Sequence, residues 1–303
     1  MSKNSRNQSV LVVGSTGYLG MEICRQLVNA GKNVKALVRP TSDPVKVNAL
    51  QQMGVETREG DLKNTASLKD AIDGVDSVIS TASSTLSRQE GDSIESVDDN
   101  GQLNLVQAAM ESGVNQFIFI SFYPISQQFS LQTAKRKVEK KLMGSKLNYT
   151  ILQSGFFMEV WISPAVGFDF PNSKVTIYGE GKNKLCWISL VDVAAIAVAS
   201  LDNEAARNSV FQVGGPEAMS PLEVVKIFEN HIGNPFAIEY VPIAALQAQK
   251  TSATESLGES FAALMLAYAE GDNIDMTETR KVYPFRLTSV MDYVQRVPAG
   301  QQV

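Results

Sequence analysis

The sequence has few of the residues that build disulfide frameworks and metal centres. Its 303 residues include two cysteines, Cys24 and Cys186, and one histidine, His231. Two isolated cysteines do not make the disulfide framework of a small secreted domain, so we expect a reducing compartment, the cytoplasm. A lone histidine with neither a Cys/His cluster nor a spaced set of carboxylates gives no zinc-type ligand pattern. We therefore expect no metal site.

The sequence also lacks the runs that mark membrane and nucleic-acid-binding proteins. No apolar run approaches the roughly 20 residues that span a bilayer, and residues 1–8 contain no apolar signal-peptide core. The chain has 27 basic and 32 acidic residues, a formal charge of −5. Its most basic run, residues 135–141, also contains Val138 and Glu139 and is typical of a solvated helix face. We expect neither a membrane nor a nucleic acid among its partners.

Three evenly spaced glycines follow a short apolar segment near the N-terminus. Residues 10–13 are apolar and mostly β-branched, as in a strand buried on both faces. Gly14, Gly17 and Gly20 come next, where an apolar helical stripe begins. Such glycines permit a tight turn, close approach of a pyrophosphate to the backbone, and contact between helix and strand. The pattern predicts a dinucleotide site, with a simple packing turn as the alternative. The residues of the turn are Gly14, Ser15, Thr16, Gly17, Tyr18, Leu19 and Gly20.

The end of the second predicted strand, residues 34–39, indicates which dinucleotide binds. In a doubly wound fold this position reaches the adenosine ribose, and an acidic residue there binds the 2′-hydroxyl of NAD. This chain has Arg39, whose planar cation suits a 2′-phosphate. Thr41 and Ser42 add hydroxyls, and Lys46 adds a second cation. We expect NADP(H) rather than NAD(H); a solvent-facing arginine at a strand end is the alternative.

Strand and helix patterns alternate through the first half of the chain. This alternation predicts a parallel sheet with right-handed crossovers, in which ligands bind beyond the carboxyl ends of the strands. Cofactor-binding candidates at such ends are Asp61, Leu62, Thr81, Ala82, Ser83, Ser121, Gly155 and Phe156. An alternative role for Asp61 is to cap the helix expected from Thr65. A polar loop is expected at residues 86–92 and a helix at residues 94–112.

A lysine at the edge of an apolar helical stripe is the candidate catalytic residue. In the helix expected over residues 130–145, the stripe consists of Leu131, Ala134, Val138 and Leu142. Lys135 lies at the edge of this stripe, while the other basic residues of the helix point progressively away. Glu139, one turn on, is placed to pair with it. Lys135 is therefore predicted to hold the nicotinamide ribose or to donate a proton. An exposed lysine lying along the helix surface is the alternative.

Aromatic residues follow two of the predicted strands and form a candidate substrate-binding wall. The candidates are Phe122, Tyr123, Phe157, Met158 and Trp161, with Phe156 beside the cofactor. Packing of these side chains in an apolar core is the alternative.

The predicted fold class is α/β: a Rossmann-type doubly wound parallel sheet with a smaller α/β C-terminal domain. We expect residues 1–155, together with 189–214, to form the NADP-binding domain. Residues 156–188 and 215–303 are expected to form the substrate-binding domain. Within the latter, Ser220, Pro221 and Glu223 mark the start of a helix.

The chain resembles the NmrA-like and isoflavone-reductase-like branch of the atypical short-chain dehydrogenases. The resemblance is carried by residues 14–20, 38–46, 60–62, 113–117 and 188–194 and by the spacing of Lys135 and Glu139. It implies a Rossmann domain that binds NADP(H), a smaller C-terminal domain that closes over a cleft, and a reductase lysine matching Lys135. Ordinary short-chain dehydrogenases have a tyrosine four residues before that lysine. Here the position is Leu131, which cannot donate a proton.

The leading hypothesis is an NADPH-dependent reductase of a small, largely apolar or aromatic compound, with Lys135 assisting hydride transfer. The alternative is a non-catalytic NADP(H)-binding redox sensor that acts on a regulatory protein partner, which the absence of the tyrosine favours. An NAD-dependent sugar epimerase is disfavoured, because it needs both that tyrosine and an acidic residue in place of Arg39.

Overall fold

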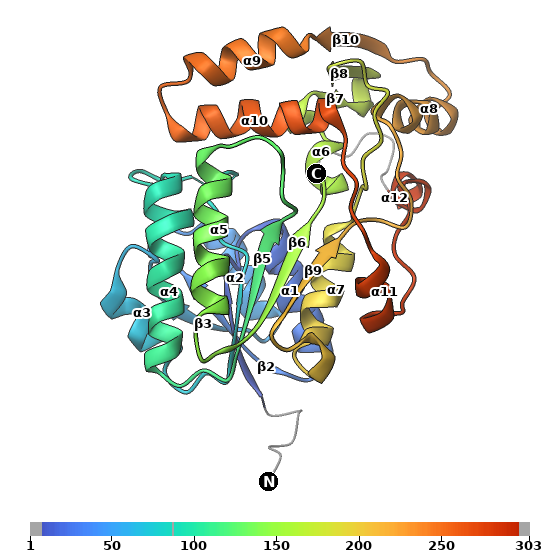
Figure 1. The fold of residues 1–303 in the computed structure, drawn as a ribbon. Helices are drawn as coiled ribbons and strands as arrows, with labels where there is room; N and C mark the ends of the chain where they lie inside the picture. Colours follow the sequence, from blue (N-terminus) through green and yellow to red (C-terminus); the bar gives the residue numbers. More distant parts are fainter. Residues whose placement is uncertain (1–7, 87, 297–303) are drawn as a thin grey trace. The chain divides into compact units, whose positions relative to one another are not determined.

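The computed structural model describes residues 8–86 and 88–296 and divides the chain into two compact units (Figure 1). Of the described residues, the first unit comprises 8–86, 88–121, Leu131–Gln153 and Val193–Phe211. The second unit comprises Phe122–Ser130, Ser154–Asp192 and residues 212–296. The assignment of residues 1–155 and 189–214 to a cofactor domain stays a prediction. The units differ from it chiefly at Phe122–Ser130, which belongs to the second unit.

A seven-stranded sheet with strand order β3-β2-β1-β4-β5-β6-β9 runs through the first unit. Its strands are β1 (Ser9–Val13), β2 (Asn33–Val38), β3 (Glu56–Glu59), β4 (Ser77–Ser80), β5 (Gln116–Phe122), β6 (Asn148–Ser154) and β9 (Ser209–Val213). The pairs β1–β2, β1–β4, β2–β3 and β4–β5 are all parallel. Chain order reverses at β1, where β2 lies on one side and β4 on the other. This is the Rossmann arrangement, so the predicted fold class is confirmed.

The helices of this unit are α1 (Tyr18–Asn29), α2 (Pro44–Gln52), α3 (Thr65–Ile72), α4 (Asn100–Glu111), α5 (Ser130–Met143) and α7 (Leu190–Ser200). A π-helix, η2 (Ile94–Asp99), precedes α4, and a 3₁₀ turn, η5 (Glu204–Ala206), follows α7. Helices α3, α4 and α5 lie on one face of the sheet, and α1 and α7 on the other (Figure 1).

A hydrophobic core between the sheet and helices α3, α4 and α5 holds these three helices against the sheet. Its buried side chains include Leu68 and Ile72 of α3, Leu105 and Val106 of α4, Val138 and Leu142 of α5, and Phe117 and Phe119 of β5. Burial of a side chain of this kind stabilises the fold by about 1.5–3 kcal/mol. Lys135 and Glu139 of α5 are polar residues that are also buried.

The second unit has a three-stranded sheet with order β10-β8-β7. Its strands are β7 (Phe168–Asp169), β8 (Lys174–Tyr178) and β10 (Ala237–Val241). Its helices are α6 (Met158–Trp161), α8 (Pro221–Ile232), α9 (Ile243–Ser252), α10 (Ser256–Glu270), α11 (Thr277–Val282) and α12 (Val290–Arg296), with 3₁₀ turns η3 (Pro164–Val166) and η4 (Phe170–Asn172). The expected helix start at Ser220 is confirmed: α8 opens with a capping box between Ser220 and Glu223.

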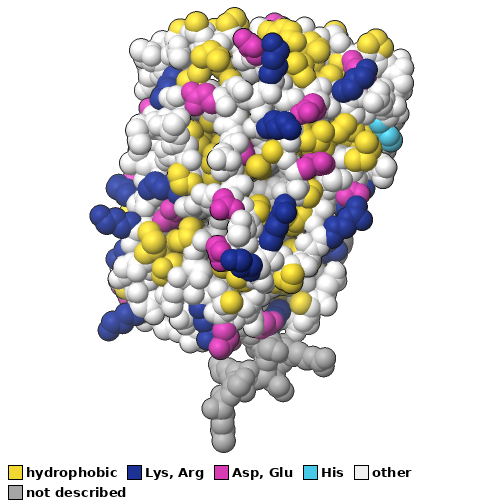
Figure 2. All heavy atoms as spheres, turned by 45° about the vertical axis from the view of Figure 1, so that its right-hand side comes forward, with side chains coloured by type: hydrophobic (Ala, Val, Ile, Leu, Met, Phe, Trp, Pro, Cys, Tyr) yellow, Lys and Arg dark blue, Asp and Glu magenta, His cyan; other side chains and the backbone are white. Residues whose placement is uncertain are grey.

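Side chains of both charges are interspersed on the face of the molecule drawn in Figure 2, and no continuous basic stripe crosses that face among the described residues. No helix of the described residues is long and apolar enough to cross a membrane. Those residues also contain no group of three or more His, Cys, Asp or Glu side chains placed to hold a metal ion.

Candidate functional site

The turn between β1 and α1 has the close backbone contacts that require glycine. Gly14 has a φ of 84°, and a Cβ there would lie 2.6 Å from Thr81 Oγ1 and 2.7 Å from the nitrogen of Ala82. A Cβ on Gly20 would lie 2.1 Å from the oxygen of Gly14. Gly17 is the N-cap of α1 and supplies no side-chain cap, so the first turn of the helix keeps backbone N–H groups for an anion.

The side chains of this turn differ in what they offer a ligand. The Ser15 hydroxyl is fully buried and donates to the oxygen of Leu37 at 2.8 Å, so it ties the turn to β2. Thr16 and Leu19 are partly exposed. Tyr18 is 54% exposed, and the Lys46 ammonium lies 5.7 Å from the centre of its ring. Lys46, the second cation expected beside Arg39, therefore lies near this aromatic ring, and its role toward the phosphate stays a prediction.

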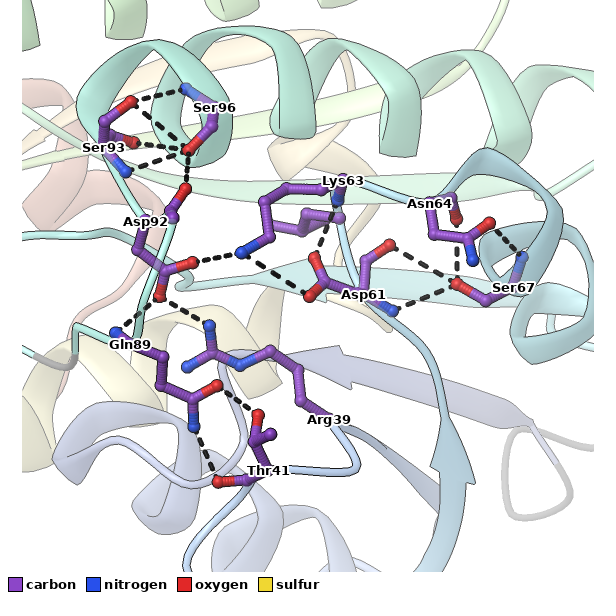
Figure 3. Close-up of polar contacts among 12 residues, drawn as sticks. Arg39, Thr41, Asp61, Lys63, Asn64, Ser67, Gln89, Asp92, Ser93 and Ser96 are labelled. Carbon is purple, nitrogen blue, oxygen red and sulfur yellow. Dashed lines mark hydrogen bonds and ion pairs between the residues drawn. The ribbon is translucent and has the colours of Figure 1, made fainter.

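Arg39 extends from the end of β2 and pairs with a carboxylate from the loop before η2 (Figure 3). Its Nη1 lies 2.6 Å from Asp92 Oδ2, and Lys63 Nζ lies 2.6 Å from Asp92 Oδ1. The backbone N–H of Gln89 donates to the same Oδ2 at 3.0 Å. The Asp92 side chain is only 1% exposed, whereas that of Arg39 is 23% exposed. Burial raises the pKa of Asp92, but the hydrogen bonds from Lys63, Arg39 and Gln89 together bring it below its ordinary value.

Asp61 lies beside this cluster and does not cap a helix. Its carboxylate accepts the Lys63 backbone N–H at 2.8 Å and lies 3.8 Å from Lys63 Nζ. The cap of α3 is Asn64, whose Oδ1 accepts backbone N–H groups from the first turn. The capping alternative for Asp61 is therefore wrong. Leu62 is 6% exposed and packs in the core under α3 and α4.

The segment after β4 lies against the glycine turn. Thr81 donates its backbone N–H to the oxygen of Val13 at 2.8 Å, and Ala82 accepts a hydrogen bond from Gln102 Nε2 at 2.8 Å. Ser83 contacts the hydroxyl of Thr85. At the end of β5, Ser121 is 5% exposed, and its hydroxyl has no hydrogen-bond partner among the described residues.

Lys135 is buried, as its place at the edge of the apolar stripe predicts. It is 5% exposed, and its Nζ lies 5.0 Å from the centre of the Phe119 ring. Its ion-pair partner is Asp98, with 3.6 Å between Nζ and Oδ1. Burial lowers the pKa of Lys135, and the carboxylates of Asp98 and Glu139 oppose this. The expected Lys135–Glu139 pair is replaced, because Glu139 pairs with Arg136 at 2.7 Å and accepts from Gln153.

Asp98 was not identified from the sequence. It is fully buried at the end of the π-helix η2, and its Oδ2 accepts from the Ser84 backbone N–H at 2.9 Å and from the Ser84 hydroxyl at 2.7 Å. Its Oδ1 faces Lys135 and has no hydrogen-bond partner among the described residues. Asp98 therefore links the segment after β4 to the lysine of α5.

The predicted substrate residues all lie in the second unit. Phe156 is the centre of an aromatic cluster, with its ring 6.0 Å from Tyr123, 4.8 Å from Trp161 and 6.0 Å from Tyr268. Trp161 and Tyr268 stack at 5.4 Å. Burial raises the pKa of Tyr123, whose hydroxyl has no partner among the described residues. The cluster therefore contains two buried phenols, those of Tyr123 and Tyr268, among aromatic rings.

The remaining predicted residues are placed differently. Phe122 stacks on Phe129 at 5.9 Å rather than joining the Phe156 cluster. Met158 is fully buried, and Phe157 forms an isolated bridge with Ile188. Gly155 belongs to the second unit, where a Cβ would lie 2.7 Å from the oxygen of Cys186. Cofactor contact by Gly155 and Phe156 stays a prediction, as do the other assigned site roles.

A family model described as the NmrA-like family matches residues 6–294. The chain belongs to this family. It is 31% identical to the photosystem II assembly factor Ycf39 of Synechocystis sp., over 80% of this chain and 73% of that protein. It is 31% identical to an NAD(P)H azoreductase of Xenophilus azovorans, over 84% of each chain. The fold matches a crystal structure of the pinoresinol-lariciresinol and phenylcoumaran benzylic ether reductases with a TM-score of 0.76, at 24% identity, over 96% of this chain and 99% of that chain.

Proposed function

We propose that this protein is an NADPH-dependent oxidoreductase that reduces a small, largely apolar or aromatic compound. The observation that carries the proposal is the burial of the Lys135 ammonium beside Asp98 and the Phe119 ring in the first unit. A buried lysine with a lowered pKa is suited to proton transfer. The 31% identity to an NAD(P)H azoreductase supports the same class of reaction.

The residues of the first unit fit NADP(H). The close approaches at Gly14 and Gly20 leave a turn without side-chain bulk in front of the N-terminus of α1, where a pyrophosphate is favoured. Arg39 supplies a guanidinium at the end of β2 for the 2′-phosphate. When bound, NADPH would supply the hydride for the acceptor. Lys135 Nζ would hold the nicotinamide ribose and would donate the proton that completes the reduction.

The test uses purified protein, NADPH and a panel of quinones, azo dyes, enones and aromatic ethers, with loss of NADPH absorbance as the readout. Lys135→Met should lower kcat by about 10²–10⁴-fold, the usual contribution of a positioned proton donor. Lys137→Met is the matched control, because Lys137 is on the same helix with its side chain 55% exposed, paired with Asp99. The proposal fails if no acceptor consumes NADPH or if Lys135→Met is as active as the control.

A second candidate is a non-catalytic NADP(H)-binding protein with a protein partner. Leu131 stands where ordinary short-chain dehydrogenases have their tyrosine, and a relative of 31% identity is named as an assembly factor. This protein would bind NADP(H) without consuming NADPH. Its capture of a partner would depend on whether NADP⁺ or NADPH is present.

We propose that the protein acts in the cytoplasm on a small-molecule substrate. The support for this location is that both cysteines, Cys24 and Cys186, are free, as expected in a reducing compartment. Fractionation of the native cell tests the location.

A further inference from the structure

The Asp92 carboxylate bridges two cations, which follow two different strands of the Rossmann sheet. Arg39 follows β2 and Lys63 follows β3, and each contacts a different oxygen of the carboxylate at 2.6 Å (Figure 3). The carboxylate comes from a third segment, the loop that precedes η2. An anion held between a guanidinium and an ammonium is the arrangement by which proteins also bind phosphate.

The loop that carries Asp92 also contacts Thr41, which comes shortly after the end of β2. Gln89 Nε2 donates to the oxygen of Thr41 at 2.7 Å, and its Oε1 contacts the Thr41 hydroxyl. The Asp92 side chain is 1% exposed, so the carboxylate occupies the space between the two cations and largely excludes water from it. A second anion cannot reach the inner faces of both cations while the carboxylate is there.

The charges of the cluster support the same conclusion. Arg39 and Lys63 contribute two positive charges, and Asp92 and Asp61 contribute two negative charges, with Asp61 3.8 Å from Lys63 Nζ. The cluster is therefore neutral as it stands. Adding a phosphate dianion to it would bring uncompensated negative charge beside a buried carboxylate, which is unfavourable. Exchanging the carboxylate for the phosphate avoids this repulsion.

We propose that Lys63 is the second cation of the 2′-phosphate site and that Asp92 is a specificity-determining residue that competes with the phosphate for Arg39 and Lys63. This inference rests on the proposed NADP(H)-binding function. A dinucleotide with a 2′-phosphate displaces the carboxylate and gains both cations. A dinucleotide without that phosphate has no group to exchange for it and leaves the carboxylate in place.

A purely structural role for Asp92 predicts the opposite sign. If the carboxylate serves to hold Arg39 and Lys63 in position for the cofactor, its removal disorders both cations and weakens NADPH binding. If it competes with the phosphate, its removal strengthens NADPH binding. The direction of the change in affinity therefore separates the two roles.

The experiment is equilibrium titration of the full-length protein with NADPH and, separately, with NADH. Asp92→Asn should lower the Kd for NADPH by about tenfold, and Lys63→Gln should raise it by about tenfold, the size of one charge-assisted contact. Both should change the Kd for NADH by less than about twofold. Glu111→Gln is the control, since it removes a carboxylate that pairs with Lys69 at 2.9 Å on the same unit. Asp92→Glu keeps the charge and should not lower the Kd for NADPH.

Three results overturn the inference while NADP(H) binding survives. These are weaker or unchanged NADPH binding by Asp92→Asn, equal effects of Lys63→Gln on both dinucleotides, and tightening by Asp92→Glu as large as by Asp92→Asn. Thermal unfolding of each variant shows whether it is folded under the conditions of the titration. If Asp92→Asn is not folded, the effects of Lys63→Gln and Asp92→Glu on the Kd for NADPH decide whether Asp92 competes with the phosphate. If neither the wild-type protein nor folded Asp92→Asn binds NADPH, this inference and the proposed function both fail.

Discussion

Lys135 has a carboxylate as its partner in a position where water is largely excluded. Asp98 is fully buried, with one oxygen held by Ser84 and the other facing the ammonium at 3.6 Å. Desolvation lowers the pKa of the lysine, and Asp98 acts against this. We therefore expect Asp98 to act through Lys135 as a positioning residue, because it influences both the place and the protonation of the ammonium.

Asp98→Asn tests this role. Loss of the negative charge removes an effect that raises the pKa of Lys135, so the pKa falls further. If protonated Lys135 donates the proton, activity declines as pH rises through that pKa. The declining limb of the pH–kcat profile should then move to lower pH in the variant.

Asp99→Asn is the matched control, because Asp99 neighbours Asp98 in sequence but pairs with the exposed Lys137. It should leave the limb where it is. A profile of Asp98→Asn that falls uniformly at all pH values, with no movement of the limb, would show that Asp98 has a structural role alone.

The backbone conformation of the turn from β1 to α1 depends most on the absence of a side chain at Gly20. A Cβ at this position would meet the oxygen of Gly14 at 2.1 Å, and backbone cannot move away as a flexible side chain can. Gly20→Ala should destabilise the protein by about 1–3 kcal/mol, the usual cost of overpacking. It should also weaken NADPH binding, because the turn proposed to hold the pyrophosphate must shift.

Gly258→Ala provides the comparison in thermal unfolding and NADPH titration. Gly258 lies in α10, and a Cβ there would have Ala253 as its nearest neighbour at 3.8 Å, an ordinary contact. Alanine favours a helix by up to about 1 kcal/mol over glycine, so stability should be unchanged or higher. Equal behaviour of the two variants would contradict the role given to Gly20.

The π-helix η2 is an element that sequence periodicity did not reveal. Residues 94–112 were expected to form one helix, but Ile94–Asp99 is a π-helix that leads into α4. A capping box between Ser93 and Ser96 starts it. π-Helical turns are rare and frequently occur at functional sites. This one has Asp92 just before it and Asp98 within it, so a single short element positions the carboxylates that meet Arg39 and Lys135.

At the scale of the whole molecule, the sequence was most informative where local pattern and tertiary structure agree. Buried strands, glycine turns and the Ser220 capping box each depend on neighbours in sequence, and the structure has them where they were expected. The burial of Lys135 also followed from helical spacing.

Its partners did not follow, because they depend on contacts between distant segments. Asp92 meets Arg39 across 53 residues of sequence, and no periodicity encodes that contact. The pairing of Lys63 with the same carboxylate, 29 residues away in sequence, does not follow from a local pattern either. Glu139 was expected beside Lys135 because it lies one helical turn away, but Arg136 and Gln153 engage it instead.

The proposed function requires that the first unit bind a dinucleotide with a 2′-phosphate. Titration of the purified wild-type protein with NADPH and with NADH, monitored by nicotinamide fluorescence, measures this binding. We expect saturable binding of one NADPH per chain and weaker binding of NADH. No association with NADPH, or equal affinity for the two dinucleotides, would show that the first unit has no such site.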